Sequence, residues 1–122
     1  MKTASSVDIV REGDVAIVSF TSRCISDVEQ ITDASSRVNR HVQENPPREI
    51  IFDFSGVKFF SSQVLGLLLE ARGHVKQHGG QVTVCGLDPQ LHRVFRITNL
   101  DRIFTFYPDR QTALSESAVR DR

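Results

Sequence analysis

The chain has 122 residues, of which 39% are hydrophobic and 25% charged, a composition typical of one globular domain and not of a disordered chain. Fifteen Lys and Arg balance fifteen Asp and Glu without a run of like charge, which argues against nucleic acid and membrane surfaces as partners. No apolar stretch approaches the roughly 20 residues that span a bilayer and the start lacks a signal-peptide core, so we expect a cytoplasmic protein.

The first half of the chain predicts a hairpin followed by a helix. Residues 7–10 and 15–20 have the β-branched character of strands and flank a turn at residues 12–14. Ser26 and Glu29 have the spacing of a capping box, which predicts that a helix begins there. The apolar residues of this helix recur at steps of three and four until two prolines end it: Val28, Ile31, Ala34, Val38 and Val42.

The second half alternates between strands and helices. Residues 49–54 form a nearly continuous apolar run, which is typical of a strand buried on both faces. The other expected elements are a helix over 62–78 ended by Gly79-Gly80, a strand over 81–85, a helix begun by Asp88-Pro89, a strand over 101–107 and a helix over 109–119. This order predicts an α/β fold with a mixed sheet of about five strands and about four helices packed mainly on one side. We expect a single domain over residues 1–122, with its core at about 7–114.

The segment between the central strand and the apolar helix is the candidate site. It places Ser61 and Ser62 at a helix N-terminus, where unpaired backbone N–H groups and the helix dipole favour a capping hydroxyl or a bound phosphate. Capping alone would explain both serines. Phe59 and Phe60 are adjacent, so an extended backbone would send them to opposite sides, where one could lie exposed beside Ser62 or both could fill the core.

Other chemistries find less support in the sequence. Glu70, His74 and His78 recur every four residues, a spacing that can bind zinc, but a solvated helix face explains the pattern and we expect no metal. A serine hydrolase would need a nucleophile elbow of the form Gly-x-Ser-x-Gly, which the chain does not contain. Cys24 and Cys85 are far apart in the sequence, and we expect both to be free thiols.

The segment from Asp53 to Gly66, followed by Gly79-Gly80, Val84-Cys85 and Asp88-Pro89, resembles the second half of a STAS domain, the family of the anti-sigma factor antagonists. The similarity extends over roughly residues 7–114. The family motif Asp-Ser-Ser/Thr-Gly-hydrophobic-Gly has a phosphate-accepting serine, and that serine falls on Ser62. Ser61 stands where the family has Asp, and Gln63-Val64 where it has Ser/Thr-Gly.

The resemblance implies a non-enzymatic regulator without a cofactor. Its implied partner is an anti-sigma factor with serine kinase activity, bound by the unmodified form and released after phosphorylation of Ser62. The surface around Ser62 would include Phe60, Ser61, Gln63 and Gly66, with Ser61 available to take over capping of the helix. An antagonist is expected to be a monomer or a weak homodimer. A STAS scaffold or accessory subunit of a stress-signalling or lipid-transport complex, without phosphate control, is the alternative.

Overall fold

A mixed five-stranded sheet forms the centre of the computed structural model, which describes residues 7–120. The strand order is β1-β2-β4-β6-β7, and β1 alone runs antiparallel to its neighbour. The strands are β1 (Val7–Glu12), β2 (Val15–Phe20), β4 (Glu49–Asp53), β6 (Gln81–Cys85) and β7 (Thr105–Tyr107). The predicted hairpin and the predicted central strand are confirmed, and all five residues of β4 are buried.

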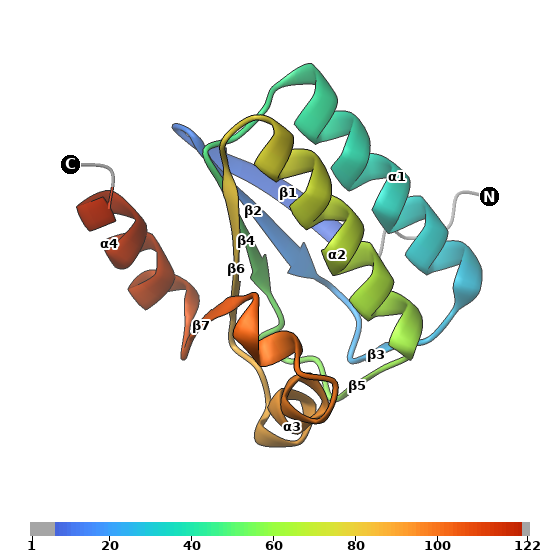
Figure 1. The fold of residues 1–122 in the computed structure, drawn as a ribbon. Coiled ribbons are helices and arrows are strands. Elements are labelled where there is room, and N and C mark those ends of the chain that lie inside the picture. Colours follow the sequence, from blue (N-terminus) through green and yellow to red (C-terminus); the bar gives the residue numbers. More distant parts are fainter. Residues whose placement is uncertain (1–6, 121–122) are drawn as a thin grey trace.

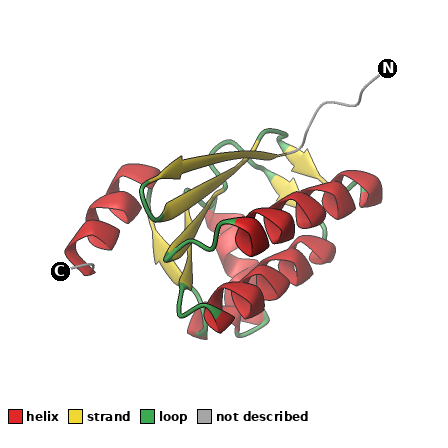
Figure 2. Ribbon diagram, turned by 90° about the horizontal axis from the view of Figure 1, so that it is seen from above, coloured by secondary structure: helices red, strands yellow, loops and turns green. Residues whose placement is uncertain are grey.

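Within residues 7–120, four α-helices surround this sheet. The helices α1 (Val28–Glu44) and α2 (Ser62–Gln77) lie side by side on one face, and α3 (Pro89–Ile97) lies near the end at which the parallel strands finish (Figures 1 and 2). The opposite face carries α4 (Arg110–Arg120). The predicted fold class is therefore confirmed, with three of the four helices contributing to the larger core.

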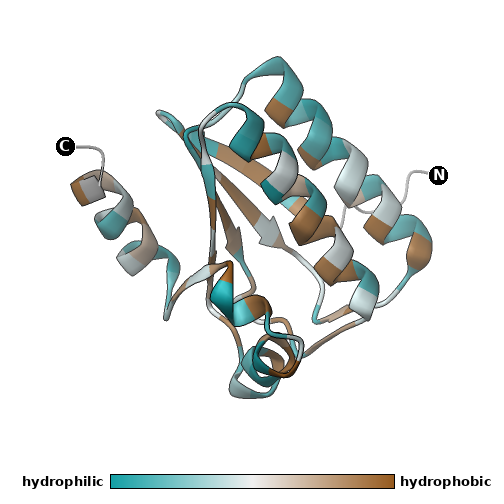
Figure 3. Ribbon diagram, viewed as in Figure 1, coloured by the Kyte–Doolittle hydropathy of each residue, from teal (hydrophilic) through white to brown (hydrophobic). Residues whose placement is uncertain are grey.

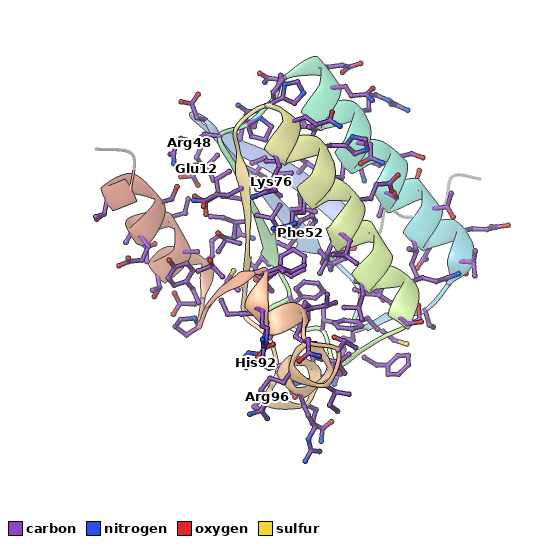
Figure 4. The ribbon with its side chains drawn as sticks, in the orientation of Figure 1. Glu12, Arg48, Phe52, Lys76, His92 and Arg96 are labelled. Carbon is purple, nitrogen blue, oxygen red and sulfur yellow. The ribbon has the colours of Figure 1, made fainter. Side chains whose placement is uncertain are left out.

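The larger core lies between the sheet and the α1/α2 layer. Apolar residues run along the central strands, while α1 alternates between apolar and polar residues (Figure 3). Phe52 of β4 is fully buried between the sheet and α2 (Figure 4). A smaller core on the other face is formed by Val15, Ile17, Ile51, Cys85 and Ala113. The apolar faces of the helices thus cover both faces of the sheet.

A second, two-stranded sheet was not predicted. It pairs β3 (Cys24–Ile25) with β5 (Phe59–Phe60) in parallel. Strands of two residues are too short to show an alternating pattern, so the sequence carried no signal for them. This small sheet fixes the chain just before α2.

The last predicted strand is shorter than expected. Leu100–Arg102 forms a 3-10 helix instead, preceded by Asn99 in the left-handed region with φ 63°. Asn is one of the few non-glycine residues that adopt this conformation readily, which allows the chain to reverse between α3 and β7. The strand itself is confined to Thr105–Tyr107.

The helix α1 begins with a different cap from the predicted one. Asp27, not Ser26, is the N-cap residue, and its Oδ1 accepts hydrogen bonds from the backbone N–H groups of Glu29 (2.8 Å) and Gln30 (3.1 Å). A carboxylate at this position also interacts favourably with the helix dipole, which is why Asp displaces the adjacent serine as the cap.

Replacing Asp27 with Ala is expected to lower the free energy of unfolding by about 1 kcal/mol, because two backbone donors lose their acceptor. Ser26→Ala is the matched control and should change it by less than about 0.5 kcal/mol, as is usual for surface substitutions. Urea denaturation of the two variants measures both values. A larger loss in Ser26→Ala than in Asp27→Ala would restore the capping-box assignment.

Candidate functional site

The loop that leads to Ser62 starts at the carboxyl end of β4. The Oδ1 atom of Asp53 accepts hydrogen bonds from the backbone N–H of Ser55 (2.9 Å) and from its hydroxyl (2.6 Å). The backbone N–H of Phe54 donates to the carbonyl of Cys85 at 2.9 Å, which ties the loop to the end of β6. The loop therefore leaves the sheet in a fixed direction.

Asp53 also connects this loop to α4. Arg110, in the first turn of α4, donates to Asp53 Oδ2 from Nε at 3.0 Å and from Nη2 at 2.9 Å, and it contacts the Ser19 hydroxyl as well. Burial acts to raise the pKa of Asp53, but the hydrogen bonds from Ser55 and the positive charge of Arg110 outweigh it and hold the pKa below its ordinary value. Asp53 is a structural anchor of the site.

Backbone hydrogen bonds then hold the loop against the segment before α1. The carbonyl of Arg23 accepts from the N–H groups of Lys58 (2.7 Å) and Phe59 (3.2 Å), and the carbonyl of Ile25 accepts from the N–H of Ser61 (2.9 Å). These bonds extend the β3/β5 pairing up to the residue before α2. The backbone that leads to Ser62 is thus held in place by hydrogen bonds to the segment before α1.

The two phenylalanines of β5 point to opposite sides. Phe60 is 6% exposed and its ring packs against Phe54 and Phe95, with ring centroids 5.6 and 6.1 Å away. Phe59 is 53% exposed, and its register partner Cys24 is exposed on the same face. The surface contact expected of Phe60 is therefore corrected, because the alternation of the strand turns Phe60 into the core and Phe59 outward.

The start of α2 lacks a side-chain cap. Ser61 occupies the N-cap position with extended backbone angles, φ −80° and ψ 164°, but its hydroxyl makes no capping hydrogen bond. Within the part of the chain that the structure describes, the buried Ser61 Oγ atom has no hydrogen-bond partner. Asp27 and Asp88, by contrast, both cap their helices through a carboxylate. The expectation that Ser61 takes over capping is therefore wrong for this structure.

Ser62 is the first residue of α2 and is exposed. Of the early helix N–H groups, that of Val64 donates to the Ser61 carbonyl at 3.0 Å. The helix is 16 residues long, so its N-terminus carries the full partial positive charge of the dipole. An exposed hydroxyl, uncapped N–H groups and a long helix form a place where a phosphate can be attached and stabilised.

The other expected surface residues lie on the next turn of α2. Gln63 and Gly66 are exposed and line a groove of about 390 Å³ between α1 and α2. The structure thus brings Ser61, Ser62, Gln63 and Gly66 together on one end of α2, with Phe59 beside them in place of Phe60.

Comparison with known proteins decides the family. A family model of the STAS domain matches residues 6–113. The chain belongs to the STAS domain family. The "Anti-sigma F factor antagonist" of Paenibacillus polymyxa is 26% identical to this STAS domain over 83 residues, which are 68% of this chain and 71% of the relative.

Solved structures share the fold of this STAS domain. An anti-sigma-factor antagonist (STAS) domain protein from Planctomyces limnophilus superposes with a TM-score of 0.83 at 24% identity, over 92% of this chain and 97% of that one. The anti-sigma factor antagonist SpoIIAA in its unphosphorylated form gives a TM-score of 0.80 at 14% identity, over 95% and 97% of the two chains. SpoIIAA of Bacillus has also been solved in a phosphorylated form.

The histidine and cysteine residues of this STAS domain do not gather into a second site. Among residues 7–119, no group of three or more His, Cys, Asp or Glu side chains could hold a metal ion. Glu70, which shares a four-residue spacing with His74 and His78, accepts a hydrogen bond from the Ser35 hydroxyl at 2.8 Å. Cys24 is exposed, while burial and the nearby Asp53 raise the pKa of the Cys85 thiol to about 12.

None of the helices in the described part of the chain is long and apolar enough to cross a membrane.

Because the pKa of Asp53 is lowered, we expect its contribution to the stability of the fold to be lost in acid. Its folded pKa lies below the unfolded value, so its stabilising contribution is complete above about pH 4 and is lost as the pH falls through the folded pKa. Asp53→Asn should therefore be less stable than the wild type at pH 7, and the difference should shrink below about pH 4. Urea denaturation from pH 7 to pH 3 measures it, and a constant difference over that range would contradict the assignment.

Proposed function

We propose that this STAS domain is an anti-sigma factor antagonist: a non-catalytic cytoplasmic protein that binds an anti-sigma factor with serine kinase activity. Phosphorylation of Ser62 by that partner ends the binding. The relative from Paenibacillus polymyxa carries the name of this function, and the fold agrees with that of other antagonists. The partner would release its sigma factor when it binds the unmodified domain.

The single observation that carries the proposal is the position of Ser62. Its hydroxyl is exposed at the first position of a long helix whose N-cap residue supplies no side-chain hydrogen bond. A phosphoserine there gains about 1.5 to 2 negative charges near pH 7, next to backbone N–H groups and the positive end of the dipole. The domain can therefore carry the phosphate without unfolding.

The covalent step would be an ordinary phosphoryl transfer. The Ser62 oxygen forms a bond to the γ-phosphorus of ATP, the bond between that phosphorus and the ADP oxygen breaks, and the hydroxyl proton passes to a base or to solvent. The catalytic groups would belong to the kinase. The STAS domain contributes an exposed hydroxyl held in a fixed direction by the β3/β5 pairing before α2.

Phosphorylation would weaken binding because the partner would have to remove water from the charged phosphate. A partner that covers the start of α2 meets a small neutral hydroxyl in the unmodified domain. In the modified domain it would have to bury a hydrated dianion, and burying an uncompensated charge costs several kcal/mol. This physical difference supports a switch between a bound and a released state.

The proposal is tested with purified proteins. Each anti-sigma factor of the serine-kinase fold encoded in the source genome is titrated with the STAS domain by calorimetry, in the presence of ADP. Saturable binding by at least one of them is expected, with the free domain eluting from a sizing column as a monomer or dimer. Elution as a large assembly without binding to any kinase would instead support the scaffold or accessory-subunit alternative.

Phe59 is expected to anchor the partner. Its ring is half exposed beside the start of α2, and aromatic side chains dominate binding energy when an interface covers them. Phe59→Ala should weaken the affinity for the kinase by at least about tenfold. Val119→Ala, on the far helix α4 and 62% exposed in the wild type, is the control and should bind normally. Equal affinities of both variants would remove Phe59 from the interface.

A further inference from the structure

The groove between α1 and α2 begins one residue after Ser62. It has a volume of about 390 Å³ and is lined mostly by polar side chains, among them Thr32, Ser35 and Asn39 of α1 and Gln63 and Glu70 of α2. Of its lining residues, Glu70 alone is charged. The groove therefore offers hydrogen-bond acceptors and one negative charge, and no lining residue supplies a cation.

Gly66 opens this groove. It lies in the interior of α2, and a Cβ atom added there would meet no atom within 4 Å. Glycine in a helix interior costs roughly 0.5–1 kcal/mol relative to Ala, so its presence at a site with room for a side chain is unfavourable for folding alone. The missing side chain leaves the space between Gln63 and Glu70 free.

Glu70 is held in place by α1. Ser35 donates its hydroxyl proton to Glu70 Oε1 at 2.8 Å, and the Asn39 amide donates to the Ser35 Oγ atom at 3.4 Å. The hydrogen bonds from Ser35 and Asn39, with a smaller contribution from the charge of His74, keep the pKa of Glu70 below its ordinary value. The carboxylate is thus ionised and oriented at the far end of the groove from Ser62.

We infer that the groove receives an arginine side chain of the partner that covers Ser62, an inference that rests on the proposed function. A guanidinium group carries five donors and a permanent positive charge, which complements the Glu70 carboxylate together with the side-chain oxygens of Gln63 and Thr32. Ser62, Gly66 and Glu70 follow one another at steps of four residues, so they lie along one face of α2. A partner seated on Ser62 therefore reaches the groove without leaving that face.

Two glycines of α2 provide a matched test. Gly66→Gln places a neutral side chain in the groove, and Gly73→Gln places the same side chain on the same helix at a residue that does not line it. An added Cβ has open space at both positions, so both variants should fold at least as well as the wild type. Glu70→Gln keeps the shape of the carboxylate and removes its charge.

The affinities of these variants are measured by calorimetry at low and high salt, with the purified serine-kinase-fold anti-sigma factor that the wild type binds. Gly66→Gln and Glu70→Gln should each weaken binding by about tenfold or more, and Glu70→Gln should also reduce its salt dependence. Gly73→Gln should bind like the wild type. Thermal unfolding followed by circular dichroism verifies that all three variants are folded.

The possible failures are distinguishable. Wild-type affinity in both Gly66→Gln and Glu70→Gln would overturn the arginine-binding groove and leave the antagonist function intact. An equal loss in Gly73→Gln would assign the effect to the helix as a whole and would also overturn the groove. A wild-type domain that binds none of the kinases would overturn both proposals. Rescue of Glu70→Arg by an Arg→Glu substitution in the kinase would identify the partner's residue directly.

Discussion

Replacing Ser62 with Asp is expected to reduce the affinity for the serine kinase by about 100-fold or more while leaving the domain folded. The carboxylate places a hydrated charge where the partner covers the start of α2, and several kcal/mol of uncompensated desolvation corresponds to more than two factors of ten in affinity. The same charge interacts favourably with the helix dipole by roughly 0.3–1 kcal/mol, so the free energy of unfolding should not fall. Calorimetric titration and urea denaturation measure the two quantities.

Two alanine variants serve as controls for Ser62→Asp. Ser62→Ala should bind the kinase like the wild type and should not be modified. Ser61→Ala removes a buried hydroxyl that has no hydrogen-bond partner in the described structure, so it should be neutral or slightly stabilising. Binding of Ser62→Asp at wild-type affinity would show that the partner does not cover the start of α2.

The second large effect is expected at Gly86, just after β6. Its φ is +72°, and an added Cβ would lie 2.6 Å from the Ser55 hydroxyl oxygen and 3.0 Å from Asp53 Oδ1. The left-handed conformation costs a residue with a Cβ roughly 1–2 kcal/mol, and forced crowding adds roughly 1–3 kcal/mol. Gly86→Ala should therefore lower the free energy of unfolding by about 2–5 kcal/mol.

Gly13→Ala separates the two contributions at Gly86. Gly13 has φ +63° in the β1/β2 turn, but a Cβ there would meet nothing within 4 Å. It should lose only the conformational part, roughly 1–2 kcal/mol, in the same urea denaturation. An equal loss of unfolding free energy in both variants would mean that Ser55 and Asp53 move aside with little loss of stability. The loop before Ser62 would then be less rigid than its hydrogen bonds indicate.

Periodic patterns in the sequence were sufficient to predict the main elements. The α1 stripe is confirmed at Ile31, Ala34, Val38 and Val42, which are all buried. Val28 is the exception at 58% exposed, because it lies at the first position of the helix, beyond the edge of the core. The apolar run at residues 49–54 correctly predicts a strand covered on both faces, and the structure confines that strand to Glu49–Asp53.

Long-range contacts could not be predicted in the same way. Nothing in the sequence connects Arg110 to Asp53, 57 positions apart, or pairs the two-residue strands β3 and β5. The orientation of Phe59 and Phe60 depends on that pairing, so the sequence predicted that they point to opposite sides but not which one is buried. The sequence likewise did not show that Ser61, at the N-cap position of α2, makes no capping hydrogen bond.

The phosphorylation state of Ser62 in the protein purified from its native cells tests the proposed switch most directly. Intact mass and peptide mapping are compared between the wild type and Ser62→Ala, over several growth conditions. We expect the wild type to gain one phosphate that maps to Ser62 and is absent from the variant. Phosphate on Ser61 alone, or no phosphate under any condition, would contradict it.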